Sequence, residues 1–145
     1  MRRALRREMG VSRFEDLVAW QEAREYCAEM GRVTDTPEFF RDGVLRPRMN
    51  KAALSIMENI AEGFERESLP EFSQFLKIAK GSTGEARAQL YAAKDRGLLR
   101  TEEFDRLFAM NVAIGKMLRR LRESLPLPRS THQGRRTRDL PRTRD

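Results

Sequence analysis

Two glutamates, Glu62 and Glu85, could carry acid–base chemistry or hold a metal ion, because paired carboxylates can share a proton or a cation. Both fall among apolar residues in helical segments, as do Ser55, Asn59 and Ser82. Buried polar groups without partners are costly, so we expect these five residues to form a hydrogen-bonded network. That network would set helix register or reach a subunit interface. We predict no catalytic residue and no metal site, and an enzyme or metal protein using the two glutamates is the alternative.

The histidine and cysteine content argues against most catalytic constellations. The sole histidine is His132, in a segment rich in proline and arginine. Ser-His-Asp triads, Cys-His pairs and di-iron sites with Glu-x-x-His therefore lack an imidazole on the helical segments. Cys27 falls on an apolar stripe and is interpreted as a small buried hydrophobe. These observations predict that the protein is not an enzyme and needs no cofactor.

A glycine pair in the third helical segment, Gly81-Ser-Thr-Gly84, is superficially similar to a phosphate cradle. It lacks the Lys-Ser/Thr that follows in a P-loop, and it does not follow a strand. Each glycine inside a helix costs roughly 1 kcal/mol relative to alanine, so something should offset the cost. We interpret Gly81, Gly84 and Ala88 as a ridge of small residues at a close helix–helix contact.

Lysines and arginines form clusters that could bind the phosphates of a polyanion. The alternative for each cluster is a solvated face, or cations favoured by a helix dipole. The phenylalanines fall on core stripes, so we expect contacts to backbone phosphates and no stacking on bases. A further basic group, Lys116, Arg119, Arg120 and Arg122, closes the fourth helical segment. The candidate nucleic-acid-binding residues are Arg46, Arg48, Lys51, Lys77, Lys80, Arg87, Lys94, Arg135, Arg136 and Arg138.

The net charge of +7 belongs to the two ends of the chain. Residues 1–10 carry four arginines against one glutamate, and residues 124–145 carry six arginines against two aspartates. The stretch 11–123 is therefore neutral overall, and the attraction of net charge for polyanions comes from the termini. No apolar run is long enough for a membrane span, and the basic start lacks the apolar core of a signal peptide. A single cysteine excludes an intramolecular disulfide, and we expect a cytoplasmic protein without membrane contact.

Four segments with helical periodicity must position these residues, at about 14–33, 45–64, 70–96 and 102–125. We predict Ser12, Ser68 and Thr101 as N-caps, Gly97 as a C-terminal cap, and Pro37 as the end of the first helix. No segment alternates with a period of two, so no sheet is expected. The pattern predicts an all-α, antiparallel up-down four-helix bundle over residues 13–125. A basic N-terminal extension, 1–12, and a basic, disordered C-terminal tail, 126–145, flank it.

Three stretches of the chain resemble one known family. They are Phe14-Glu-Asp-Leu-Val-Ala-Trp20-Gln, Ala53-Leu-Ser-Ile-Met-Glu-Asn-Ile-Ala-Glu-Gly63 and Glu71-Phe-Ser-Gln-Phe-Leu-Lys-Ile-Ala-Lys-Gly-Ser82. Together they resemble the bacterial four-helix bundle proteins first noticed as ribosomal-RNA intervening-sequence proteins. The resemblance implies a ring-like homopentamer without enzymatic activity. It also implies kinship with accessory proteins of diversity-generating retroelements, which bind a reverse transcriptase and nucleic acid. Pro47 departs from the family pattern, and the tail lies outside it.

Some apolar and small residues lie off the main stripes, at Val18, Tyr26, Ile78, Gly81 and Ala92. A second apolar face suggests contacts between subunits, because a monomeric bundle needs only one buried face on each helix. We therefore expect a homo-oligomeric scaffold that binds nucleic acid, with RNA favoured by the resemblance. A protein–protein interaction module, which would dock a polymerase such as a reverse transcriptase, is the alternative.

Overall fold

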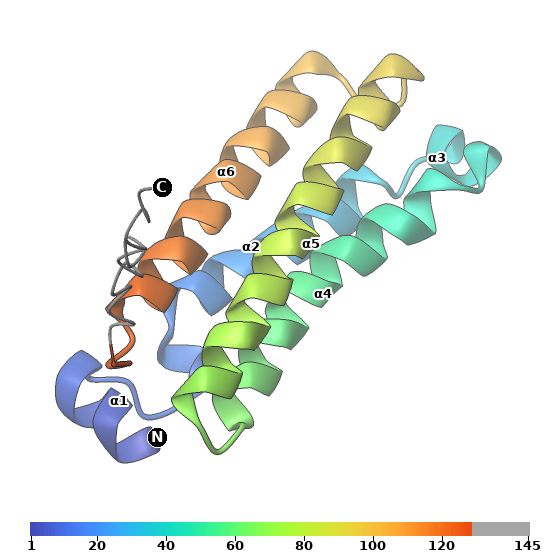
Figure 1. Ribbon diagram of the computed structural model, residues 1–145. Coiled ribbons are helices and arrows are strands. Elements are labelled where there is room, and N and C mark those ends of the chain that lie inside the picture. The colour runs from blue at the N-terminus through green and yellow to red at the C-terminus, as the bar shows by residue number, and fades with distance from the viewer. Residues whose placement is uncertain (129–145) are drawn as a thin grey trace, which may run out of the picture.

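The computed structural model describes residues 1–128, and all regular structure within that range is helical (Figure 1). The remaining residues, 129–145, include the predicted Arg135, Arg136 and Arg138 and most of the predicted tail, which therefore lie outside the described residues. The prediction of an all-α chain is confirmed for the described part. Its elements are α1 (Arg2–Met9), the 3-10 helix η1 (Phe14–Asp16), α2 (Val18–Val33), α3 (Pro37–Asp42), α4 (Leu45–Glu65), α5 (Leu69–Asp95) and α6 (Thr101–Ser124).

The four long helices pack side by side around one core (Figure 1). Helix α2 contacts α4 and α6, and α5 contacts the same two helices. Residues at helical spacing supply the core, such as Ile56, Ile60 and Phe64 on α4. Burying each such side chain fully stabilises the fold by about 1.5–3 kcal/mol. The short helices α1 and α3 lie at opposite ends of the long ones (Figure 1).

Two predicted helix boundaries are confirmed at the ends of α5. The Ser68 hydroxyl accepts a hydrogen bond from the Glu71 backbone N–H at 3.3 Å and donates to the Glu71 carboxylate at 2.7 Å. Gly97 ends the helix with a φ of +71°, in the left-handed region that favours glycine. Its backbone N–H donates to the Lys94 carbonyl at 2.9 Å.

The predictions of Ser12 and Thr101 as N-caps are wrong. Before η1, the Asp16 carboxylate accepts hydrogen bonds from the backbone N–H groups of Ser12 and Arg13, at 3.2 and 3.1 Å. Before α6, the Glu103 carboxylate accepts from the Arg100 backbone N–H at 3.1 Å. In both places a carboxylate in the first turn accepts hydrogen bonds from backbone N–H groups ahead of the helix. The hydroxyl residue therefore does not determine where the helix begins.

The short helix α3 is not among the predicted helices, because a proline such as Pro37 also suits the end of a preceding helix. The Thr36 hydroxyl accepts from the Phe39 backbone N–H at 3.3 Å, and Pro37 occupies the first helical position. Proline suits that position, where its missing N–H costs nothing. Phe39 is completely buried, so this short helix seals one end of the core.

The predicted basic N-terminal extension folds as α1 and is attached to the core through Leu5, which is almost completely buried.

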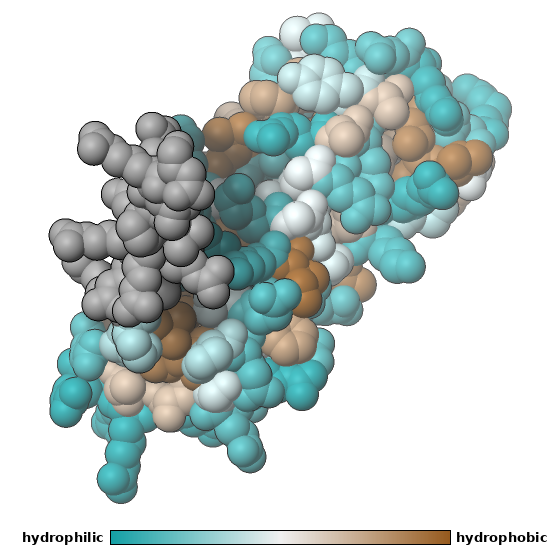
Figure 2. Space-filling model, viewed as in Figure 1, coloured by the Kyte–Doolittle hydropathy of each residue, from teal (hydrophilic) through white to brown (hydrophobic). Residues whose placement is uncertain are grey.

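The residues predicted at subunit contacts differ in their exposure. Tyr26, predicted at a subunit contact, is completely buried between the helices of its own chain. Val18 and Ile78 are exposed, as a subunit contact would require. Hydrophilic residues cover most of the face in Figure 2, with small hydrophobic areas between them. No helix among the described residues is long and apolar enough to cross a membrane.

The two glycines of the predicted small-residue ridge on α5 make no close contact with another helix within the described residues. Among the described residues, a Cβ built on Gly81 or Gly84 would have no neighbouring atom within 4 Å. We therefore expect Gly81→Ala to raise the free energy of unfolding by about 1 kcal/mol, the difference in helix propensity. Urea denaturation of both proteins measures this change. A loss of stability would mean that something outside the described chain contacts this position.

Candidate nucleic-acid interface

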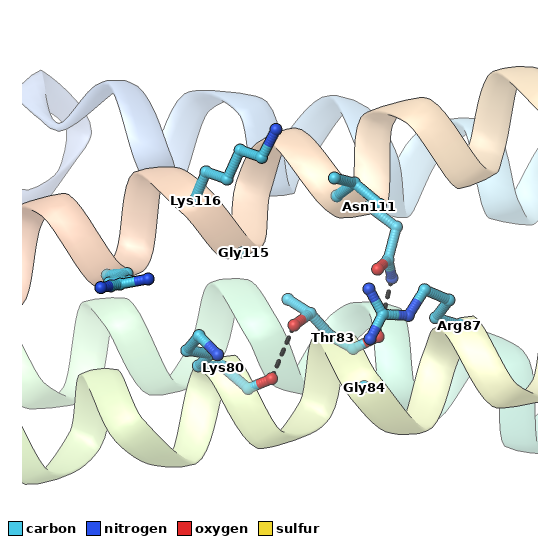
Figure 3. A pocket seen from close by; sticks show the side chains of 9 residues that line it. Lys80, Thr83, Gly84, Arg87, Asn111, Gly115 and Lys116 are labelled. Atoms are coloured by element: carbon cyan, nitrogen blue, oxygen red, sulfur yellow. Dashed lines mark hydrogen bonds between the residues drawn. The ribbon is translucent and has the colours of Figure 1, made fainter.

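A groove of about 270 Å³ lies between α5 and α6 (Figure 3). We call it the α5/α6 groove. Helical spacing explains its lining: Lys80, Gly84 and Arg87 follow one another at steps of four and three, and therefore share the face of α5 that meets α6. Glycines on both helices keep the groove open, because they add no side chain to fill it. The lining residues are Lys80, Thr83, Gly84, Arg87, Asn111, Val112, Gly115, Lys116 and Arg119.

Positive charge dominates the rim of the groove. Lys80, Arg87 and Lys116 are exposed, and none of them forms a salt bridge within residues 1–128. Of the four lining cations, Arg119 alone is paired within this range, with the exposed Glu123 carboxylate at 2.9 Å. Cations that lack nearby carboxylates create a positive potential, which attracts phosphates. The groove can therefore bind a polyanion.

The floor of the groove is a buried polar network that joins three helices. Asn111 on α6 is only 1% exposed, and its Nδ2 donates to the Thr83 carbonyl of α5 at 2.8 Å. The same Nδ2 donates to the Tyr26 hydroxyl of α2 at 3.2 Å. The Thr83 hydroxyl donates to the Lys80 carbonyl at 2.6 Å. These bonds hold the floor rigid beneath the cationic rim.

Burial also changes the acidity of the tyrosine in this network, raising the pKa of Tyr26 from 10.0 to about 12. Between these values the unfolded chain loses the phenol proton while the folded chain keeps it. The unfolded state then binds fewer protons, so stability falls as the pH rises. We expect a loss on the order of 2 kcal/mol between about pH 9 and about pH 12. Urea denaturation across this range should show a smaller loss in Tyr26→Phe, and parallel curves for the two proteins would contradict the expectation.

The three predicted basic residues on α4 lie in two separate places. Arg48 and Lys51 line a separate recess between α4 and α5, together with Ser55 and Glu85. Arg46 lies apart from them, with its guanidinium 4.2 Å from the centre of the Phe40 ring. A cation over an aromatic face is stabilising without any ligand. The α4 cluster is therefore not one continuous site.

The four predicted cations of α5 also separate. Lys80 and Arg87 line the α5/α6 groove, whereas Lys77 is exposed outside it. The Lys94 ammonium lies 4.4 Å from the centre of the Phe104 ring. The structure thus brings Lys80 and Arg87 together with Lys116 and Arg119, two members of the basic group that closes the fourth predicted segment.

Three of the five predicted polar-network residues are joined by hydrogen bonds. The Ser55 and Ser82 hydroxyl oxygens lie 3.0 Å apart, and Asn59 Nδ2 donates to the Ser55 carbonyl at 2.7 Å. Glu62 is exposed and pairs instead with Arg66 at 2.8 Å, while Glu85 is exposed at the recess between α4 and α5. The described residues contain no cluster of three histidine, cysteine, aspartate or glutamate side chains that could hold a metal ion.

Asn111 was not identified from the sequence, although the pattern contains a signal for it. Leu107, Asn111, Ile114 and Leu118 follow one another at steps of four, three and four, and all are buried. A polar residue at one position of an apolar stripe needs a partner there. The partner carbonyl of Thr83 and the hydroxyl of Tyr26 come from other helices, so only the folded chain reveals them.

One protein family matches most of the chain. The model of the family described as 23S rRNA-intervening sequence protein matches residues 15–120. The chain belongs to this family. The match confirms the resemblance of the three sequence stretches, and it includes the whole α5/α6 groove. No curated protein matches the chain.

Proposed function

We propose that this protein is a non-enzymatic helical scaffold that binds RNA along the α5/α6 groove. The observation that carries the proposal is the convergence of Lys80, Arg87 and Lys116 on one groove without a paired carboxylate among the described residues. The family name supports RNA as the polyanion. Phosphates would contact the rim cations, and the glycines of the groove would allow the backbone to approach closely.

Contacts of this kind require a steep dependence on salt. Each protein cation that contacts a phosphate displaces a counterion from the RNA. In a plot of the logarithm of the binding constant against the logarithm of salt concentration, each such contact contributes a slope of about −0.7 for a single strand. The four rim cations would therefore contribute a slope of nearly −3, and the arginines of residues 129–145 would add to it.

The test is a fluorescence anisotropy titration of a labelled RNA of mixed sequence with the full chain, over a range of salt concentrations. We expect tight binding at about 50 mM salt and a steep loss of affinity by about 200 mM. Deleting residues 129–145 should reduce the slope without abolishing binding. The absence of binding at the lowest salt concentration would overturn the proposal.

The family resemblance adds a proposal about assembly. The four long helices would form an antiparallel up-down bundle, and such bundles would assemble as a ring-like homopentamer. Val18 and Ile78 support self-association, because their side chains are 59% and 44% exposed. Light scattering that gives the mass of one chain would exclude an oligomer.

The alternative is a module that docks a protein partner, such as a reverse transcriptase. Further exposed apolar side chains favour it, Phe40 on α3 and Val44 directly before α4. Recovery of one protein partner after nuclease treatment would support docking. Loss of that partner on nuclease treatment would favour RNA binding.

A further inference from the structure

The orientation of the Asn111 amide is determined by its neighbours. The Thr83 carbonyl can only accept a hydrogen bond, so the amide nitrogen must face it, at 2.8 Å. The same nitrogen also donates to the Tyr26 hydroxyl, so both amide hydrogens have partners. Figure 3 shows the amide reaching toward α5, with its bond to Thr83 as a dashed line. The amide oxygen, Oδ1, therefore takes part in neither of these two hydrogen bonds.

Within residues 1–128, Asn111 Oδ1 accepts no hydrogen bond from another group. The side chain is 1% exposed, and the small exposed part lines the α5/α6 groove. This oxygen is thus a hydrogen-bond acceptor left open to a donor from outside the protein. A molecule bound in the groove can supply that donor.

The ligand must therefore match two requirements at once. The rim of Lys80, Arg87 and Lys116 attracts an anionic group, and the floor offers an acceptor to a neutral donor such as a hydroxyl. RNA carries both on each nucleotide, a phosphate and a ribose 2′-hydroxyl, and DNA lacks the hydroxyl. The arrangement of charge above an acceptor that no described protein group uses thus favours ribose over deoxyribose.

An exposed aromatic ring continues the same seam. Tyr91 lies one helical turn beyond Arg87 on α5, and its side chain is 49% exposed. Its ring meets Phe104 and Phe108 of α6 edge-on, with centroid distances of 5.3 and 5.9 Å. Two phenylalanines thus hold the tyrosine in place while part of its surface remains free. Unpaired bases stack on such rings, whereas the bases of a duplex already stack on one another.

We propose that the α5/α6 groove selects single-stranded RNA, with a ribose 2′-hydroxyl donating to Asn111 Oδ1 and a neighbouring base stacking on Tyr91. This inference rests on the proposed function of the groove and specifies its ligand. It also revises the sequence-based expectation that bases would not stack. Phosphate contacts supply most of the affinity, and the floor and the tyrosine supply the choice of ligand.

The decisive experiment changes the ligand and leaves the protein intact. Anisotropy titrations of the full chain compare oligouridine RNA with the same oligomer carrying 2′-fluorine, which resembles the hydroxyl in size but cannot donate a hydrogen bond. We expect the fluorinated strand to bind about tenfold more weakly. In Asn111→Ala the ratio of the two affinities should approach one. Equal binding of the two strands by the wild-type chain would overturn the role of Asn111.

Tyr91 has its own matched pair of variants. Tyr91→Phe keeps the ring and should bind the RNA strand normally, whereas Tyr91→Ala should weaken binding about tenfold. Neither variant should change the affinity for duplex RNA, which offers no free base. Equal loss for single strands and duplexes would overturn the stacking role. If wild-type protein binds no RNA at all, the proposed function fails too, whereas RNA binding that ignores the 2′ group leaves that function standing.

Discussion

The triple variant Lys80→Gln, Arg87→Gln, Lys116→Gln binds RNA about 100-fold more weakly than the wild-type chain at moderate salt, if the α5/α6 groove holds the backbone. The estimate takes roughly 1 kcal/mol for each lost phosphate contact. All three side chains are exposed and lack salt-bridge partners among the described residues, so their loss should leave the fold intact. The slope of affinity against salt should also decrease by about two. Anisotropy titrations at several salt concentrations measure both quantities.

A second triple variant separates the groove from net charge. Arg24, Arg41 and Arg120 are exposed and lie outside the groove, on α2, α3 and α6. Changing these three to glutamine removes the same number of charges, and we expect only a small loss of affinity. Equal losses in the two triple variants would mean that RNA responds to net charge alone. Unchanged binding by the groove variant would assign the binding to another part of the chain, such as residues 129–145.

Gly63→Ala destabilises the protein by about 2 kcal/mol, because α4 and α5 are too close there to admit a methyl group. A Cβ built on Gly63 would lie 2.5 Å from the Phe75 Cβ and 3.1 Å from the Phe72 ring. The Phe75 Cβ is bonded directly to the backbone of α5, so the helix itself must move. Overpacking of this kind costs about 1–3 kcal/mol, more than alanine gains in helix propensity.

The measurement is urea denaturation of Gly63→Ala beside Gly81→Ala. Both substitutions add one methyl group inside a long helix, but the methyl group at Gly81 would meet open space. We therefore expect changes of opposite sign, a loss at Gly63 and a gain at Gly81. A Gly63→Ala protein as stable as the wild type would show that the contact between α4 and α5 adjusts easily.

Short-range chemistry accounts for what could be predicted about the helices. The hydroxyl of Ser68 and the left-handed conformation of Gly97 act on backbone within the same turn, so local sequence is sufficient to identify them. Pro37 was ambiguous, because proline suits both the end of one helix and the first turn of the next. Ser12 and Thr101 each lie one residue from the true N-caps, Arg13 and Arg100, whose backbone N–H groups bond to the carboxylates of Asp16 and Glu103.

The residues of the candidate site also fall into two groups, those that the local sequence predicts and those that only helix packing brings together. Helical period alone places Lys80 and Arg87 on one face of α5, since it depends only on the rotation per residue. That Lys116 faces them, that Asn111 bonds to Thr83 and Tyr26, and that Gly63 touches Phe75 depend on how the helices pack. Such contacts join residues far apart in the chain, and the geometry between packed helices is set by the whole core. Residue order therefore specified the helices and their charged faces, while packing created the groove.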